Sequence, residues 1–163
     1  TCAAGIAAFD GVDRRFHYKG TKAGVDVYDD YAHHPTEIMA VLAAFKEKFP
    51  DRRLVVVFQP HRYSRSLLCW EQFLTSLKDA NRIFICDIYA AGEDPIAGIH
   101  SKRLASEMAA KLGDAVRVDY LSNETDRVAV LHSEVKSGDV LITLGAGDVY
   151  KLGMQFLSGE VGR

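Results

Sequence analysis

The sequence predicts an α/β fold: a Rossmann-like, doubly wound, mostly parallel sheet with helices on both faces. Short apolar runs alternate with segments whose apolar residues recur at helical spacing. The runs LVVVF and IFIC are continuously apolar, which is typical of parallel strands buried on both faces. Because the 163 residues contain no internal repeat or linker, we expect residues 1–163 to form a single domain.

The first expected strands, 14–20 and 23–31, flank a Gly/Thr/Lys turn. We expect them to pair as a short antiparallel N-terminal hairpin or edge strand. A helix is predicted at 35–49, because Pro35 suits its first turn and Pro50 ends the apolar pattern.

The rest of the chain continues the alternation of strand, loop and helix. Strand 52–59 leads to helix 64–80, and strand 82–89 leads through the turn-rich segment 90–98 to an amphipathic helix. The remaining expected elements are a helix at 100–113, a strand at 116–121, a helix at 123–138, a strand at 139–147 and a helix at 149–160.

The composition is ordinary for a globular protein, with 48% hydrophobic residues, 26% charged residues and a net charge of −2. This charge gives no reason to expect binding to nucleic acid or to an anionic membrane. No apolar run approaches the roughly 20 residues that span a bilayer, and the start TCAAGIAAFDG lacks a signal peptide's basic region. Cys2, Cys69 and Cys86 form no zinc-binding pattern, so we expect reduced thiols in a cytoplasmic protein.

Three loops follow expected strands and precede expected helices: 29–36, 59–65 and 145–148. In open parallel sheets, ligands bind beyond the carboxyl ends of the strands. We therefore expect the three loops to lie along one rim of the sheet and to carry the chemistry of the protein.

The first loop, DDYAHHPT, concentrates acids and histidines at a strand end. Asp30 could accept hydrogen bonds from the vicinal hydroxyls of a ribose, and His33 or His34 could donate to a phosphate or carboxylate. The alternative is that Asp29, Asp30 and Thr36 only end the strand and cap the helix. Two adjacent histidines cannot face one point from a regular strand or helix, which argues against a two-histidine metal site.

The second loop, QPHRYSR, carries His61, Arg62 and Arg65 directly after a buried strand. Two planar guanidinium forks and an imidazole at a helix start suit a carboxylate or a phosphate. The alternative is a solvated basic loop in which Ser64 or Ser66 caps the helix.

The third loop, within GAGDVYKLG, has Gly145, Gly147 and Gly153, whose spacing is not that of the dinucleotide-binding fingerprint. We interpret it as a tight turn from strand to helix. The sequence also contains no G-x-x-x-x-G-K-[ST] phosphate loop, no G-x-S-x-G elbow and no H-E-x-x-H zinc helix. The chain therefore has binding loops without a self-sufficient catalytic apparatus.

In this order, DDYAHHPTEI, FQPHRYSR, IYAAGEDPIAG and GAGDVYKLG resemble the C-terminal domain of the Mur ligase family. FQPHRYSR favours the branch that joins L-alanine to UDP-N-acetylmuramate, and the murein tripeptide ligase branch is the alternative. The resemblance implies a cytoplasmic, ATP-dependent ligase of peptidoglycan precursor synthesis that works through an acyl phosphate. It also implies partner domains, N-terminal and central, in the same chain, with Mg²⁺ held mainly by the central domain. The isolated domain would then be inactive.

The resemblance implies roles for seven residues in this sequence. It assigns Arg15 and Asp30 to the nucleotide, although the neighbouring Arg14 leaves the arginine uncertain by one position. It assigns Tyr31 and His33 to the reacting centre and the incoming L-alanine, with His33 as the candidate catalytic residue.

The same resemblance assigns His61, Arg62 and Arg65 to the carboxylate of L-alanine, in agreement with the anion site that the residue types suggest. Two other functions stay open: a stand-alone module that binds a small carboxylate or nucleotide, and a Rossmann-type oxidoreductase. The glycine spacing argues against the second.

Overall fold

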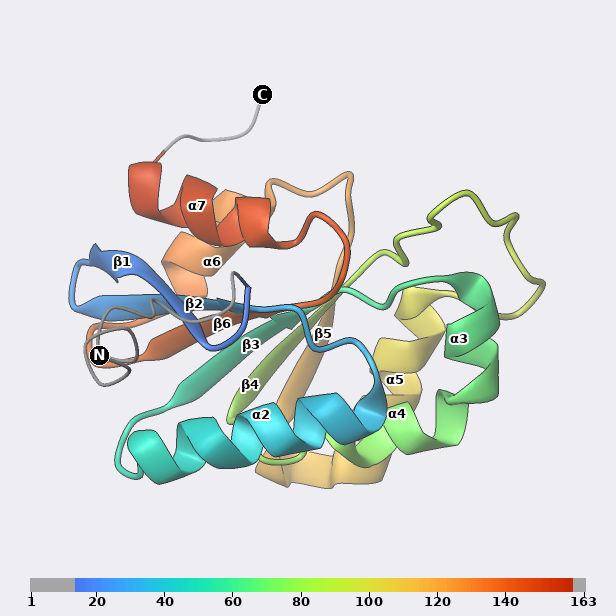
Figure 1. The fold of residues 1–163 in the computed structure, drawn as a ribbon, viewed down its shortest axis with the longest axis horizontal. Helices are drawn as coiled ribbons and strands as arrows, with labels where there is room; N and C mark the ends of the chain where they lie inside the picture. Colours follow the sequence, from blue (N-terminus) through green and yellow to red (C-terminus); the bar gives the residue numbers. More distant parts are fainter. Residues whose placement is uncertain (1–13, 160–163) are drawn as a thin grey trace, which may run out of the picture.

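The computed structural model describes residues 14–159, which form a six-stranded sheet between two layers of helices (Figure 1). The strand order is β1-β2-β6-β3-β4-β5, with β1 antiparallel to β2 and the other neighbours parallel. The strands are β1 (His17–Lys22), β2 (Val25–Asp30), β3 (Leu54–Phe58), β4 (Arg82–Cys86), β5 (Arg117–Leu121) and β6 (Val140–Leu144). The helices are α2 (Pro35–Lys48), α3 (Tyr63–Leu68), α4 (Trp70–Ser76), α5 (Ser101–Leu112), η1 (Gly113–Ala115), α6 (Arg127–Glu134) and α7 (Tyr150–Ser158). The predicted fold class is confirmed.

The turn of the N-terminal hairpin lies later than predicted. β1 continues through the Gly/Thr/Lys segment, and the chain reverses at Ala23 and Gly24, whose φ angles are +50° and +78°. Two successive positive φ angles are characteristic of the I′ turn, which matches the twist of paired strands. Gly20 lies inside β1, at the position where the register of the hairpin shifts.

Residues of β3 alternate between two separate hydrophobic cores. Leu54, Val56 and Phe58 belong to the core that the sheet shares with α2, α4 and α5. Val55 and Val57 belong to the core under α6 and α7. A strand with a core on each face needs apolar residues at every position, which explains the continuous run in the sequence. Among residues 14–159, no helix is long and apolar enough to cross a membrane.

The predicted helix 64–80 is divided into two helices by Cys69. Trp70 begins α4 with its ring turned inward, and its Nε1 donates a 2.7 Å hydrogen bond to Glu107 of α5. α3 remains at the surface, where Leu68 is 82% exposed. The apolar spacing runs through both helices, so it could not reveal the break between them.

The cysteines of the described region are free thiols. Cys69 is half-buried, and Cys86 is buried at the end of β4, where burial raises the pKa of its thiol to about 12. Cys2 lies outside the described residues.

Candidate functional site

The three candidate loops lie on one rim of the sheet, as predicted. β6 is flanked by β2 and β3, and all three strands are parallel, so their carboxyl ends share an edge. The amide N–H of Gly145 donates to the carbonyl of Asp30, and that of Gln59 donates to the carbonyl of Leu144. The imidazole centroids of His33 and His61 are 5.8 Å apart. These contacts join the ends of β2, β3 and β6 into one continuous surface.

Asp30 ends β2 beside a pocket of about 350 Å³ between the sheet and α2. Asp30 is only 4% exposed, and its carboxylate accepts hydrogen bonds from the amides of Phe16, at 2.6 Å, and Ala32, at 2.8 Å. Burial raises the pKa of the Asp30 carboxyl above its ordinary value, although both amides oppose the rise. Two backbone amides therefore hold the Asp30 carboxylate in the wall of the pocket.

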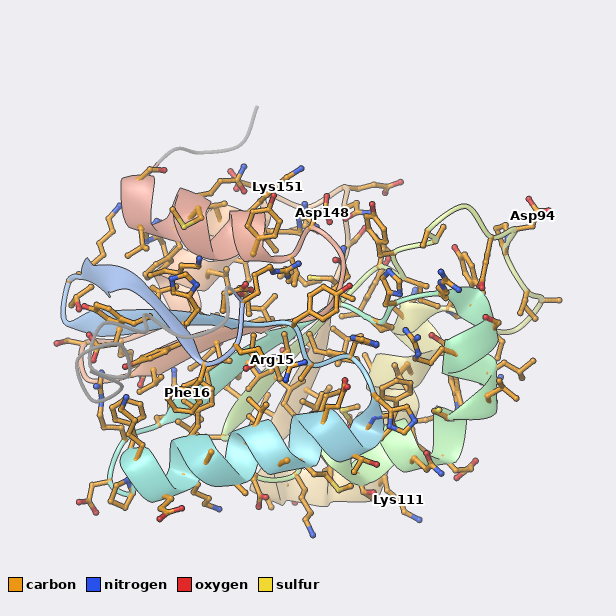
Figure 2. All side chains as sticks on the ribbon, viewed as in Figure 1. Arg15, Phe16, Asp94, Lys111, Asp148 and Lys151 are labelled. Atoms are coloured by element: carbon orange, nitrogen blue, oxygen red, sulfur yellow. The ribbon has the colours of Figure 1, made fainter. Side chains whose placement is uncertain are left out.

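Arg15 and Arg14 are separated by the structure. Arg15 lines the same pocket as Asp30, and Figure 2 shows it between the sheet and α2. The pocket also has apolar lining from Phe16 and Val41, which suits the face of a flat ring. Glu37 of α2 lines the pocket as well, so a ligand there would meet one guanidinium, two carboxylates and an apolar wall.

Arg14 instead makes structural contacts within the rim. Its Nε lies 2.8 Å from a carboxylate oxygen of Asp29, which is 1% exposed. Its other nitrogens donate to the carbonyls of Gly145, at 2.7 Å, and Gly147, at 3.1 Å. The second oxygen of Asp29 accepts from the hydroxyl of Thr143 at 2.7 Å. Arg14 thus fastens the glycine turn to the end of β2.

The guanidinium of Arg14 also lies near two aromatic rings of the rim. Its central carbon is 5.1 Å from the centroid of Tyr31 and 4.8 Å from that of Tyr150. The backbone N–H of Tyr31 donates to the carbonyl of Arg14. Arg14 and Asp29 therefore fix the position of Tyr31, one of the predicted site residues.

The histidines of the first loop have different partners. His33 Nδ1 is 2.9 Å from the carbonyl of Tyr31, and its ring faces His61. His34 is the N-cap of α2: its Nδ1 accepts from the amide of Thr36, and its own amide donates to Glu37. The helix begins at Pro35, as predicted, but the alternative in which Thr36 caps it does not hold, because the N-cap is His34.

His61, Arg62 and Arg65 of the second loop lie beside His33 of the first loop, and we call these four residues the cationic cluster. Arg65 Nη1 lies 3.2 Å from His61 Nδ1 and 3.3 Å from the carbonyl of His61. Burial, followed by the charges of Arg65, His33 and Arg62, lowers the pKa of His61 below its ordinary value. At neutral pH His61 is therefore largely uncharged, and the two arginines supply the positive charge of the cluster.

Arg62 precedes α3 with a φ of +70°. A non-glycine residue with such a backbone angle is strained by on the order of 1–3 kcal/mol, and surrounding contacts must offset this strain. The amide of Arg62 donates to the carbonyl of Tyr89 at 2.8 Å. The alternative in which Ser64 or Ser66 caps α3 does not hold, since Ser64 donates to Glu93 and Ser66 donates to the carbonyl of Arg62.

The third loop is a tight turn that other loops pack against. A Cβ on Gly145, whose φ is +147°, would lie 2.8 Å from the carbonyl oxygen of Gln59. A Cβ on Gly147 would collide with the side chains of Gln59 and Tyr89. Gly153 lies instead in α7, where a Cβ would lie 3.2 Å from a side-chain methyl of Val27. The glycines therefore serve close packing, as the interpretation of a strand-to-helix turn requires.

Tyr89 and Glu93 belong to this rim but have no role in the sequence-based prediction. Both lie in the segment 87–100 that follows β4, and Glu93 accepts from the amide and hydroxyl of Ser64. The signal that could have found them was IYAAGEDPIAG, because it too follows the carboxyl end of a parallel strand.

Within residues 14–159, no group of three or more His, Cys, Asp or Glu side chains is placed to hold a metal ion.

Sequence comparison matches residues 14–147 to the glutamate ligase domain of the Mur ligases. The UDP-N-acetylmuramate–L-alanine ligase of Bdellovibrio bacteriovorus is 51% identical over 158 residues, which cover 97% of this chain and 34% of that protein. The enzyme of the same name from Trichlorobacter lovleyi is 47% identical over 149 residues, 91% of this chain and 32% of that protein. The chain thus spans about a third of the length of these relatives.

Two solved structures have the same fold. The UDP-N-acetylmuramate–alanine ligase of Thermotoga maritima superposes with a TM-score of 0.74 at 27% identity, covering 93% of this chain and 30% of that one. A murein peptide ligase from Psychrobacter arcticus also gives 0.74, at 23% identity, covering 95% of this chain and 31% of that one. With the family match across most of the chain, these likenesses lead to one conclusion: the chain belongs to the Mur ligase family.

Proposed function

We propose that residues 1–163 are the C-terminal domain of an ATP-dependent ligase that joins L-alanine to UDP-N-acetylmuramate. The reaction would take place in the cytoplasm, during synthesis of peptidoglycan precursors. The observation that carries this proposal is the adjacency, on one rim, of the Arg15–Asp30 pocket and the cluster around His61. The names of the relatives that are 47–51% identical support the same reaction.

In this proposal the pocket binds the nucleotide. Asp30 accepts hydrogen bonds from the ribose hydroxyls, since its carboxylate retains lone pairs beyond those used by two backbone amides. Arg15, which lines the same pocket, attracts the negative phosphates. The apolar wall at Phe16 and Val41 excludes water from the face of the base.

The cationic cluster binds the carboxylate of L-alanine. Arg62 and Arg65 supply charge and donors, and His61, neutral at pH 7, supplies a polar contact without adding charge. A small acceptor such as L-alanine leaves only a methyl group to recognise, which is worth about 1–3 kcal/mol, so steric exclusion of larger side chains must contribute to selectivity.

His33 and Tyr31 face the amine of L-alanine in this arrangement. When His33 is neutral and donates from Nδ1 to the carbonyl of Tyr31, its Nε2 keeps a lone pair. That lone pair can accept a proton from the L-alanine ammonium and so free the amine for attack. His33 is accordingly the catalytic residue that we assign to this domain.

ATP would supply the energy for activating the muramoyl carboxylate as an acyl phosphate, with Mg²⁺ neutralising the phosphate charge. We assign Mg²⁺ to no residue of 14–159, because these residues offer no suitable cluster of ligands. In our proposal Mg²⁺ is held by the central domain, and the N-terminal and central domains complete the site. The chain alone should therefore release no phosphate.

A chimeric enzyme tests the proposal. The segment of the Bdellovibrio bacteriovorus ligase that matches this chain is replaced by residues 1–163, and phosphate release is measured with UDP-N-acetylmuramate, ATP and Mg²⁺. We expect release to depend on L-alanine, with little response to glycine, serine or the murein tripeptide. A chimera with Arg62→Ala and Arg65→Ala is the matched control for the acceptor site.

Two outcomes would contradict the proposal. A folded chimera that binds ATP but shows no release dependent on L-alanine would favour a stand-alone module for a nucleotide or small carboxylate. Release that responds to the tripeptide but not to L-alanine would favour the murein tripeptide ligase instead. Circular dichroism and ATP binding verify folding in each case.

A further inference from the structure

The segment 87–100, which contains the motif AAGEDPIAG, has no role in the function proposed above. It leaves the carboxyl end of β4 and extends outward, and Figure 2 shows Asp94 far from Arg15, at the outer part of this loop. Its first residues, however, run along the second candidate loop. Tyr89 lies there, 40% exposed, between that loop and the glycine turn.

The backbone of Tyr89 is fixed by the residues that precede α3. Its N–H donates to the carbonyl of Pro60 at 2.8 Å, and its carbonyl accepts from the N–H of Arg62 at 2.8 Å. Tyr89 and His61 thereby form a parallel β-bridge beyond the ends of β3 and β4. The two hydrogen bonds of this bridge stabilise Arg62 at its positive φ and fix the position of the Tyr89 backbone, from which the ring projects.

The ring of Tyr89 is stacked on the imidazole of His61, with centroids 5.5 Å apart and planes 10° apart. On another side it approaches Gly147 so closely that a Cβ there would lie 2.7 Å from Tyr89 Cγ. The ring therefore cannot move toward the glycine turn. His61 is correspondingly confined between the ring of Tyr89 and the guanidinium of Arg65, 3.2 Å from its Nδ1.

We propose that Tyr89 is a positioning residue of the acceptor site, whose ring orients His61 toward the carboxylate bound by Arg62 and Arg65. Tyr89 itself need not touch the substrate. The proposal deepens the proposed function and rests on it for the identity of the ligand. The contact between the two rings is independent of that function and can be measured without a ligand.

The titration of His61 reports on this contact. Burial is the largest cause of the lowered pKa of His61, and the charges of Arg65, His33 and Arg62 lower this pKa further. The charge of Glu93 raises the pKa of His61. Removing the ring of Tyr89 exposes the imidazole to water, so the pKa of His61 should rise toward the ordinary histidine value.

The first experiment is an NMR titration of the histidine ring protons in residues 1–163, comparing wild type with Tyr89→Leu and Tyr89→Phe. Tyr89→Leu should move the His61 ring signals, because the ring current of the stacked tyrosine is lost, and should raise the pKa of His61. Tyr89→Phe keeps the stacking and should restore the wild-type titration. Tyr18→Leu is the matched control, because Tyr18 is an exposed tyrosine on β1 whose ring packs on Tyr28. An unchanged His61 titration in Tyr89→Leu, with the fold intact, would overturn the proposal.

The second experiment measures kinetics in the chimeric ligase. Tyr89→Leu should raise KM for L-alanine about threefold to tenfold, leave kcat and KM for ATP within about twofold, and be rescued by Tyr89→Phe. A uniform loss of kcat, or no rescue by phenylalanine, would contradict a positioning role. If the wild-type chimera shows no reaction with L-alanine, the proposed function fails, while the NMR titration still decides whether Tyr89 orients His61.

Discussion

Replacing Asp29 by asparagine should destabilise the fold far more than the same replacement of Asp26, which lies on the same strand. Asp29 is 1% exposed, and its two oxygens contact Arg14 Nε at 2.8 Å and the hydroxyl of Thr143 at 2.7 Å. Removing one member of a buried ion pair costs about 3–5 kcal/mol. Because the Arg14 side chain is 18% exposed and water can partly solvate it, we expect about 2–4 kcal/mol here.

The matched control is Asp26→Asn, at the opposite end of the same strand. Asp26 also pairs with an arginine, Arg52, and accepts a hydrogen bond from the hydroxyl of Thr21, but the two charged side chains are 25% and 28% exposed, so the replacement should cost only about 1 kcal/mol. Urea unfolding followed by circular dichroism measures the free energy of unfolding of both variants. A loss of about 3 kcal/mol also corresponds to a fall in Tm of about 6–12 °C for a chain of this size. Equal losses in the two variants would refute the reasoning. So would a double-mutant cycle of Asp29→Asn with Arg14→Met that gives no coupling energy.

In the chimeric ligase, Arg62→Ala and Arg65→Ala should each raise KM for L-alanine by roughly 10- to 100-fold, because a hydrogen bond to a charged group contributes about 1.5–3 kcal/mol. An unchanged KM in both variants would contradict the carboxylate assignment. Arg15→Ala should instead raise KM for ATP and spare KM for L-alanine, and steady-state kinetics with each substrate varied would reveal a reversed pattern. Gly145→Ala should lower the free energy of unfolding by about 1–3 kcal/mol, since its Cβ would press on the carbonyl of Gln59 at a φ of +147°. A urea midpoint equal to that of wild type would show that the turn relaxes freely.

The layered sheet was predictable because burial imposes a local pattern on each element. The continuous run 54–58 indicated a strand with a core on both faces, and the structure divides its residues between two cores. The rule that ligands bind at the carboxyl ends of parallel strands then located the rim. Local spacing was insufficient where a break depends on distant packing, as at Cys69, where Trp70 turns inward and contacts Glu107.

Which side chains meet on the rim was decided only by the tertiary structure. The sequence by itself determined the α/β class, the three loops and the residue types suited to anions and nucleotides. It could not separate Arg14 from Arg15, because neighbours in sequence diverge only when the chain packs against Asp29 and the glycine turn. Nor could it bring Tyr89 onto His61, since their contact arises from the pairing of β3 with β4, and strand pairing depends on the whole sheet.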